Sequence, residues 1–305
     1  MHVVLLGTAA GGGFPQWNCW CPTCTTARTS PQLARPRRQS SVAFSADGRR
    51  WFLGNASPDV REQIAALPSA NTPPKNGVRY VPIEGIMLTD AELDHTLGIA
   101  LLREGRSLQV AAPPPVLETL MEDSRVIPVT QAFAEVSLIR LEPGIATPLP
   151  YRDGKESGLT VEVFPVAGDP PRFARHQSPG QTVGALLRDT KSGGAVAFVP
   201  GCGALDAKLL DRLATADLVL FDGTFWTDDE LIALGISDKA ARDIGHLPVS
   251  GASGSLLQLS KLPSRTKVYT HINNTNPMLV EGSEERKQVE GAGLTVGMDG
   301  MAFEV

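Results

Sequence analysis

The chain has 305 residues and a formal net charge of -5, with hydrophobic residues at 42% and charged residues at 20%. This is the composition of an ordinary globular protein with a large core, and the negative charge argues against a nucleic-acid-binding surface, which has to be basic. No apolar run is long enough to span a bilayer, and the chain starts without the basic region or cleavage site of a signal peptide, so we expect a cytoplasmic protein that contacts neither membrane nor nucleic acid.

The first expected strand, at residues 3–6, leads into a glycine-rich loop at residues 7–13. A glycine loop after a strand can cradle a nucleotide, but neither Gly-Lys-Ser/Thr nor the G-x-G-x-x-G spacing is present. We therefore expect these glycines to let the backbone approach a neighbouring site closely.

Three of the four cysteines follow in the pattern Cys19-x-Cys21-x-x-Cys24. In a reducing compartment such a cluster is more often a metal site than a disulfide. Three thiolates at this spacing suit a tetrahedral zinc with a fourth ligand from elsewhere, and a zinc closed by four protein ligands holds structure. Cys202 is remote from the cluster, and as a lone thiol it is expected to be a small buried side chain.

Alternating apolar segments and turn residues predict the elements that follow. Strands at 41–44 and 51–53 flank Asp47-Gly48, which is a strong hairpin signal. Ser57 as cap and Pro58 in the first turn predict a helix that runs to about Ala66.

Further strands are expected at residues 86–88, 108–112, 159–166, 195–199, 218–222 (which ends in an acid) and 267–271, and further helices at 116–123, 206–214 and 255–259. Asp299-Gly300 predicts a last hairpin that closes the chain. No composition break or long linker divides the sequence, so we expect one domain of two β-rich halves with helices outside.

The strand at 86–88 is followed at once by four candidate metal ligands, Asp90, Glu92, Asp94 and His95. Loops at strand ends often carry the chemistry of α/β proteins, because a rigid strand aims the loop. An extended backbone would point the Asp90 and Glu92 carboxylates the same way. The pattern fits a metal site made mainly of oxygen ligands, or a helix-capping loop in which Asp94 binds free backbone amides.

Two of the five histidines are strong site candidates. His271 ends an expected buried strand, just as the acidic loop follows another strand. His246 lies in a loop after a helix, where it could bind a metal, contact substrate or act as a general acid or base. His176, in a proline-flanked loop, ranks below His246, and His2 is expected to be structural.

These motifs together resemble the metallo-β-lactamase superfamily. Asp90-x-Glu92-x-Asp94-His95 is similar to its motif H-x-H-x-D-H with the first two histidines replaced by carboxylates. His271 matches the last histidine ligand of that superfamily.

One family within the superfamily is more similar still, the B proteins of pyrroloquinoline quinone (PQQ) biosynthesis. The glycine-rich start, the cysteine cluster and the segments 245–248 and 270–277 carry this resemblance over nearly the whole chain. It implies an αββα sandwich of one domain over residues 1–305, with a metal site at the strand ends between the sheets. It also implies that the cysteine loop at 19–24 binds a structural zinc associated with a homodimer.

The same resemblance implies a function. The family acts with other PQQ biosynthesis proteins and is linked to iron-dependent hydroxylation of the tyrosine in a Glu–Tyr intermediate.

Two departures from the superfamily pattern affect the ligands. The middle histidine is missing near Gly168-Asp169, and Gly201-Cys202 stands where the superfamily has a bridging aspartate, so Asp169 and Cys202 are open alternatives. Related enzymes place a histidine ligand of the cysteine zinc three positions after the one that matches His271. Here that position is Asn274, which is therefore the candidate fourth ligand.

The donor set favours one chemistry over the others. A hydrolase with two zinc ions needs several imidazoles and a bridging carboxylate, whereas two histidines with carboxylate oxygens are close to the ligands of mononuclear non-haem iron oxygenases. We predict an Fe(II)- and O2-dependent hydroxylase, although Mn2+ or Zn2+ would also suit such a site. The predicted active-site ligands are Asp90, Glu92, Asp94, His95 and His271, and the predicted catalytic residues are His246 and Asp94. The alternatives are a metal-dependent hydrolase of a phosphodiester or ester and a non-catalytic carrier of PQQ.

Overall fold

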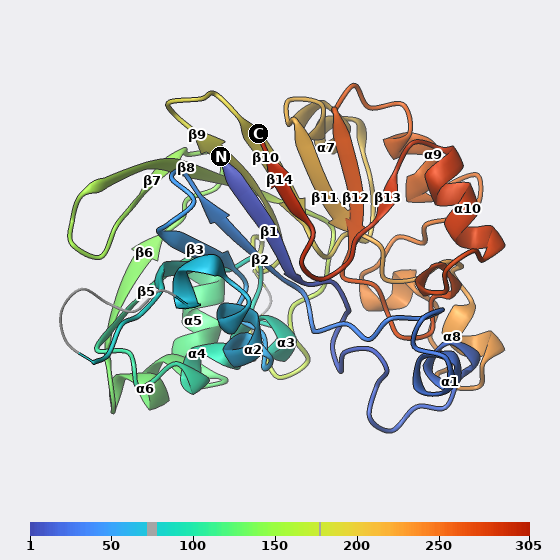
Figure 1. The fold of residues 1–305 in the computed structure, drawn as a ribbon, viewed down its shortest axis with the longest axis horizontal. Coiled ribbons are helices and arrows are strands. Elements are labelled where there is room, and N and C mark those ends of the chain that lie inside the picture. The colour runs from blue at the N-terminus through green and yellow to red at the C-terminus, as the bar shows by residue number, and fades with distance from the viewer. Residues whose placement is uncertain (72–77, 177) are drawn as a thin grey trace.

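Two seven-stranded β-sheets face each other in the computed structural model, which describes residues 1–71, 78–176 and 178–305 (Figure 1). In spatial order, the first sheet contains β14 (Ala302–Glu304), β1 (His2–Gly7), β2 (Ser41–Ser45), β3 (Trp51–Gly54), β4 (Ile83–Met87), β5 (Ser107–Ala112) and β6 (Glu135–Arg140). The second contains β13 (Thr295–Val296), β12 (Thr266–Thr270), β11 (Leu218–Asp222), β10 (Ala195–Val199), β9 (Val183–Asp189), β8 (Glu156–Pro165) and β7 (Thr147–Pro150).

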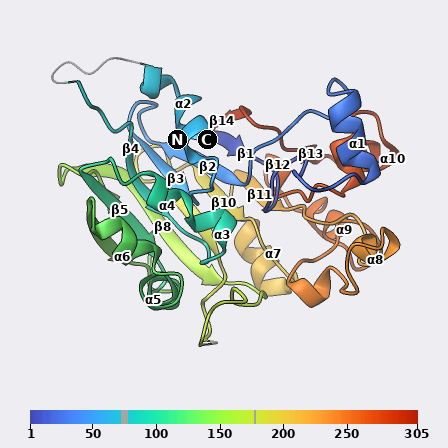
Figure 2. The same ribbon diagram turned by 90° about the horizontal axis from the view of Figure 1, so that it is seen from below.

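Helices cover the outer face of each sheet, as the view from below shows (Figure 2). Those beside the first sheet are α2 (Val60–Ala65), α4 (Gly98–Leu101), α5 (Pro114–Glu122) and α6 (Val126–Gln131). Those on the side of the second are α1 (Pro22–Thr29), α7 (Ala207–Leu213), α8 (Glu230–Ala233), α9 (Ser255–Leu259) and α10 (Glu284–Gly291). The remaining short helices are α3 (Leu93–Thr96), η1 (Pro68–Asn71), η2 (Arg242–Ile244) and η3 (Pro277–Leu279). Within the described ranges, no helix is long and apolar enough to cross a membrane.

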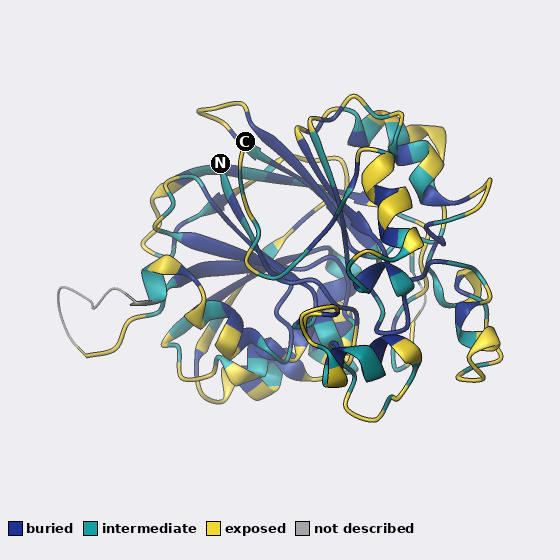
Figure 3. Ribbon diagram, turned by 45° about the vertical axis from the view of Figure 1, so that its right-hand side comes forward, coloured by how far each residue is buried: buried dark blue, intermediate teal, exposed yellow. Residues whose placement is uncertain are grey.

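Three apolar layers hold this sandwich together, and the strands are its most buried parts (Figure 3). Strand β10 shows why its sequence is apolar throughout, because successive side chains point to opposite faces of a sheet. Val196 and Phe198 belong to the layer between the sheets, whereas Ala197 and Val199 belong to the layer under the outer helices. The arrangement confirms the single-domain αββα sandwich.

Both sheets combine antiparallel and parallel strands in the same way. Strands β1 to β3 and β7 to β10 pair antiparallel, and strands β3 to β6 and β10 to β13 pair parallel. The carboxyl ends of parallel strands meet at one edge of a sheet. Segments that follow β4, β11 and β12 are brought together in this way.

The helix expected to start at Ser57 begins later. Asp59 is the residue before α2, which starts at Val60. The Ser57 hydroxyl donates to Gln63 Oε1 (2.8 Å) and accepts from the Asp59 N–H (3.1 Å), so it braces a turn ahead of the helix and does not cap it. By contrast, the hairpin at Asp47-Gly48 is confirmed, with β2 and β3 antiparallel.

The hairpin expected at Asp299-Gly300 is wrong. Gly300 does have the positive φ of a turn glycine (88°), and its N–H donates to Leu5 O (2.7 Å). However, β13 pairs with β12 in the second sheet, and β14 pairs with β1 in the first. The turn therefore carries the chain from one sheet to the other, and the strands on its two sides are not partners.

Candidate metal centre

A cavity of about 740 Å³ opens where strands of both sheets end. From the first sheet, β4 leads through residues 88–92 into α3, which contains Asp94 and His95. From the second sheet, β12 delivers His271 to the same cavity. The site is thus assembled from strands of both sheets that are far apart in the sequence.

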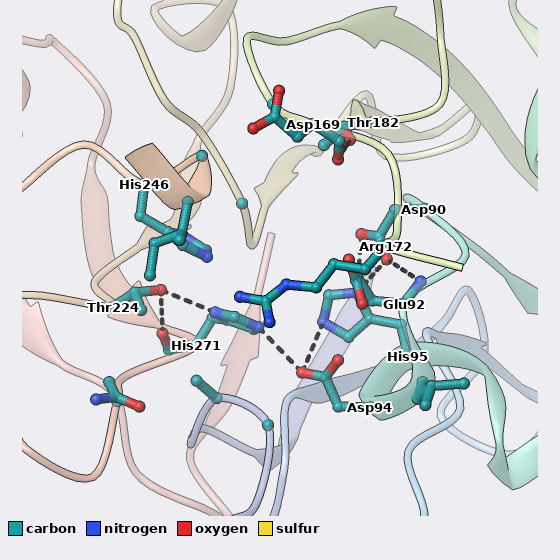
Figure 4. Close-up of a pocket in the computed structure, with 18 of the residues that line it drawn as sticks. Asp90, Glu92, Asp94, His95, Asp169, Arg172, Thr182, Thr224, His246 and His271 are labelled. Carbon is teal, nitrogen blue, oxygen red and sulfur yellow. Dashed lines mark hydrogen bonds and ion pairs between the residues drawn. The ribbon is translucent and has the colours of Figure 1, made fainter. Parts of the chain in front are cut away.

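Asp94, His95 and His271 lie together in this cavity (Figure 4), and their ligand atoms are all within 4.8 Å of one another. Asp94 Oδ2 is 3.3 Å from His271 Nε2 and 3.8 Å from His95 Nε2. His95 Nε2 is buried and has no hydrogen-bond partner among the described residues. A buried ring nitrogen that faces a carboxylate without a hydrogen bond fits a bound cation, because buried polar atoms otherwise find partners. Two imidazole nitrogens and a carboxylate oxygen suit a divalent transition metal.

Asp90, predicted as a metal ligand, lies behind His95 and outside this cluster. Both of its carboxylate oxygens are 2.8 Å from His95 Nδ1. They also accept from the Thr89 hydroxyl (2.8 Å) and the Glu92 N–H (2.9 Å). Histidines that bind metals usually donate their other ring N–H to such a carboxylate, which fixes the ring and its tautomer. Asp90 therefore has the geometry of a residue that orients His95.

The carboxylates around His95 strongly favour a positive charge. Burial alone lowers the pKa of His95, but the negative charges of Asp90 and Asp94 outweigh burial and raise that pKa to about 9. Burial likewise tends to raise the pKa of Asp94, yet the neighbouring His95 holds it well below its usual range. A metal cation in place of the imidazole proton would be stabilised by the same charges.

Glu92, also predicted as a ligand, lines the cavity but lies outside the cluster of Asp94, His95 and His271. Burial and the neighbouring charges of Asp90 and Asp94 raise the pKa of Glu92 to about 7.

A second group of donors shares His271. The ligand atoms of Asp222, His246 and His271 are also within 4.8 Å of one another. His246 Nδ1 is 2.7 Å from Asp222 Oδ2, and its ring stacks on that of His271 with centroids 5.5 Å apart. Asp222, the acid at the end of β11, is visible in the sequence but had no predicted role. Its place at the end of an expected buried strand, like that of His271, was the signal that could have found it.

Asp169 and Cys202 were the open alternatives for the missing middle histidine and the missing bridging aspartate. The Cys202 thiol donates to Ala204 O (3.0 Å), and burial raises its pKa to about 12, so it is a poor source of thiolate. Its backbone N–H donates to Asp222 (2.9 Å), the acid that actually reaches the histidines. Asp169 lines the cavity, whereas His176 is exposed and is not among the described residues that line it.

His271 has an unusual backbone conformation that aims its ring at Asp94. Its φ of 54° is left-handed, a conformation that costs a non-glycine residue about 1–3 kcal/mol. The Thr224 hydroxyl lies 2.9 Å from His271 Nδ1 and 2.8 Å from His271 O, and holds the residue in place. On the other side, a Cβ at Gly11 would lie only 3.3 Å from Asp94 Oδ2. The glycine-rich loop thus approaches the site closely, as expected.

The cysteine cluster forms a separate group on the second-sheet side. The sulfur atoms of Cys19, Cys21 and Cys24 are all within 4.8 Å of one another. Asn274 lies beside them, with its side-chain nitrogen 3.3 Å from Cys24 Sγ and its backbone oxygen 3.6 Å from Cys21 Sγ. Because Asn274 follows His271 by three residues, one segment contacts both groups.

Replacing Asp90 by asparagine tests its orienting role. We expect Asp90→Asn to weaken metal binding roughly 10- to 100-fold, the usual effect of losing a carboxylate behind a ligating histidine, while saturating metal still fills the site. Metal titration followed by elemental analysis measures this. A complete loss of binding at saturating metal would instead make Asp90 a ligand.

Comparisons with known proteins relate this chain to one family. A family model described as "Beta-lactamase superfamily domain" matches residues 50–272. The chain is similar to the coenzyme PQQ synthesis protein B of Methylobacterium nodulans (41% identity, 99% of each chain) and of Pseudomonas aeruginosa (40% identity, all of each chain).

Solved structures give the same result. The crystal structure of Zn2+-bound PqqB from Methylobacterium extorquens matches over the full length of both chains with a TM-score of 0.89 and 38% identity. A diphosphatase of the PhnP family shares the fold alone, with a TM-score of 0.65, 19% identity and coverage of 100% of this chain and 97% of that one. The chain belongs to the coenzyme PQQ synthesis protein B family, within the β-lactamase superfamily.

Proposed function

We propose that this protein acts in PQQ biosynthesis as an Fe(II)- and O2-dependent hydroxylase of the tyrosine ring in a Glu–Tyr-derived intermediate. The names of its relatives support the pathway. The observation that carries the chemistry is the meeting of two imidazole nitrogens and one carboxylate oxygen, from His95, His271 and Asp94, inside a cavity. This donor set is typical of non-haem iron oxygenases.

Asp94, His95 and His271 would hold the iron, with Asp90 orienting His95. When bound, iron would supply the redox chemistry with O2 that no side chain provides. One oxygen atom of O2 enters the new ring C–O bond, and the other leaves as water. The balance requires two electrons and two protons, so the reaction also needs a two-electron reductant as co-substrate.

His246 is the proposed proton-transfer residue. Its Nδ1 lies 2.7 Å from Asp222, and its side chain lines the cavity. Burial lowers the pKa of His246, but the Asp222 carboxylate outweighs burial and raises it. A histidine held by a carboxylate in this way can take up and return a proton at its other nitrogen. Phe173 and Phe225 also line the cavity and provide apolar surface for an aromatic ring.

Anaerobic reconstitution with Fe(II) tests the hydroxylase. With a Glu–Tyr dipeptide and ascorbate as reductant, we expect oxygen uptake and a product that contains one additional oxygen atom on the tyrosine. Apoprotein and Zn(II)-loaded protein are the controls and should be inactive. No uptake across several preparations with verified iron occupancy would contradict the proposal and favour a hydrolase or a carrier of PQQ.

One observation favours a hydrolase as the second candidate. Asp222, His246 and His271 form a second donor group beside the first, and hydrolases of this kind hold two metal ions close together. Such an enzyme would bind a second metal ion and turn over a phosphodiester or ester without oxygen. Metal stoichiometry and anaerobic turnover therefore separate the two candidates.

For the cysteine cluster we propose a structural zinc held by Cys19, Cys21 and Cys24, with Asn274 as fourth ligand, that supports a homodimer. The convergence of three sulfur atoms with an asparagine from a distant segment supports this proposal. A zinc closed by four protein ligands contributes to folding and has no open position for chemistry.

A further inference from the structure

We infer that Arg172 binds the free α-carboxylate on the tyrosine unit of the substrate and so selects substrates that carry this group. The inference rests on the proposed function, because it names the part of that substrate which the cavity recognises. Arg172 lines the same cavity as the metal-centre residues, and its side chain extends into the cavity in Figure 4.

Three acids around the cavity already face histidines, and the other acids of its lining, Glu92, Asp169 and Asp243, make no ion pair with Arg172. The carboxylates of Asp90 and Asp94 already face His95 and His271, and Asp222 faces His246. Along the described lining, Arg172 and Lys239 supply all the arginine and lysine side chains. Among the described residues, no hydrogen bond or ion pair involves the Arg172 guanidinium.

The chain segment that carries Arg172 is anchored and stiff. Pro170 and Pro171 precede Arg172, and proline fixes the backbone φ angle. The Thr182 hydroxyl donates to Asp169 O (3.2 Å), and the Ala174 N–H donates to Pro171 O (2.8 Å). These contacts fix the backbone from which the Arg172 side chain extends, and the planar fork of a guanidinium matches the two oxygens of a carboxylate.

The cavity lining next to Arg172 suits the aromatic ring of a tyrosine unit. Phe173 follows Arg172 directly and lines the cavity, so apolar surface for the ring adjoins the cation. With a divalent metal at Asp94, His95 and His271, the cavity would hold a metal cation, the Arg172 guanidinium and the Lys239 ammonium group. An aromatic substrate with a negative charge can pair with these cations, whereas a neutral substrate would leave the guanidinium unpaired.

Arg175 offers a matched control in the same segment. It is also exposed, but its guanidinium is 3.4 Å from Asp123, and it is not among the described residues that line the cavity. Replacing Arg175 by glutamine removes the same charge three residues away without touching the proposed contact.

Equilibrium binding to Zn(II)-loaded protein without oxygen tests the inference independently of turnover. We expect the wild type and Arg175→Gln to bind Glu–Tyr roughly 10- to 100-fold more tightly than its C-terminal amide, the effect of one charge-assisted hydrogen-bonded pair. Arg172→Gln should lose this preference and bind acid and amide alike, with unchanged metal content. Arg172→Lys should keep part of it.

Two results would overturn the inference: an acid preference that survives in Arg172→Gln, or a wild type that binds Glu–Tyr no better than its amide. If the preference depends on Arg172 but iron-loaded protein takes up no oxygen, the inference stands and the hydroxylase proposal falls. If hydroxylation occurs without such a preference, the hydroxylase stands and Arg172 has no role in recognition.

Discussion

Iron retention should be abolished when His271 is replaced by alanine or glycine. His271 supplies one of only two imidazole nitrogens in the cluster with Asp94, and it also belongs to the second donor group. Loss of a carboxylate behind a ligand weakens binding about 10- to 100-fold, so loss of the ligand itself should exceed about 100-fold. Elemental analysis after anaerobic loading and desalting measures the iron that remains.

The glycine variant separates loss of the imidazole ligand from misfolding caused by the substitution. His271 has a φ of 54°, a left-handed conformation that glycine adopts freely, so His271→Gly removes the imidazole while relieving backbone strain. Circular dichroism and thermal unfolding should show a folded protein, and zinc at the cysteine cluster should remain. Full iron occupancy in a folded variant would contradict the assignment of His271.

Changing Cys21 to serine should remove the zinc proposed at the cysteine cluster and weaken the proposed homodimer. A serine hydroxyl is a far poorer zinc ligand than a thiolate, and binding energy at a structural zinc is also folding energy. We expect zinc content to fall at least about tenfold. The melting temperature should fall by roughly 5–10 °C, the shift that about 3 kcal/mol would give in a domain of this size. Sedimentation should show a larger monomer fraction.

Cys202→Ala is the control for this experiment. Cys202 is also buried, but its thiol donates to Ala204 O and lies outside the cluster of Cys19, Cys21 and Cys24. This variant should keep its zinc and its oligomeric state. Unchanged zinc content in Cys21→Ser would mean that the three thiols serve another purpose. Loss of zinc from the cysteine cluster should also affect metal binding by His271, because Asn274 and His271 belong to the same short segment.

Local sequence patterns predicted most of the described strands, but they missed β6, β7 and β9 and more than half of the described helices, such as α6 and α10. The apolar run of β10 and the turn at Asp47-Gly48 are local signals, since burial on both faces and a tight turn each demand particular residues nearby. Likewise, Asp94, His95 and His271 were predicted as site residues from their place at strand ends. The family resemblance then supplied the αββα arrangement.

Pairing and side-chain direction were decided by the tertiary structure alone. The sequence shows an aspartate at 90 and another at 222, but not that the first lies behind His95 or that the second meets His246. It shows a turn at Asp299-Gly300, but not that the strands on its two sides join different sheets. The physical reason is that hydrogen-bond partners and sheet edges belong to residues distant in sequence, whose meeting depends on the packing of the whole chain.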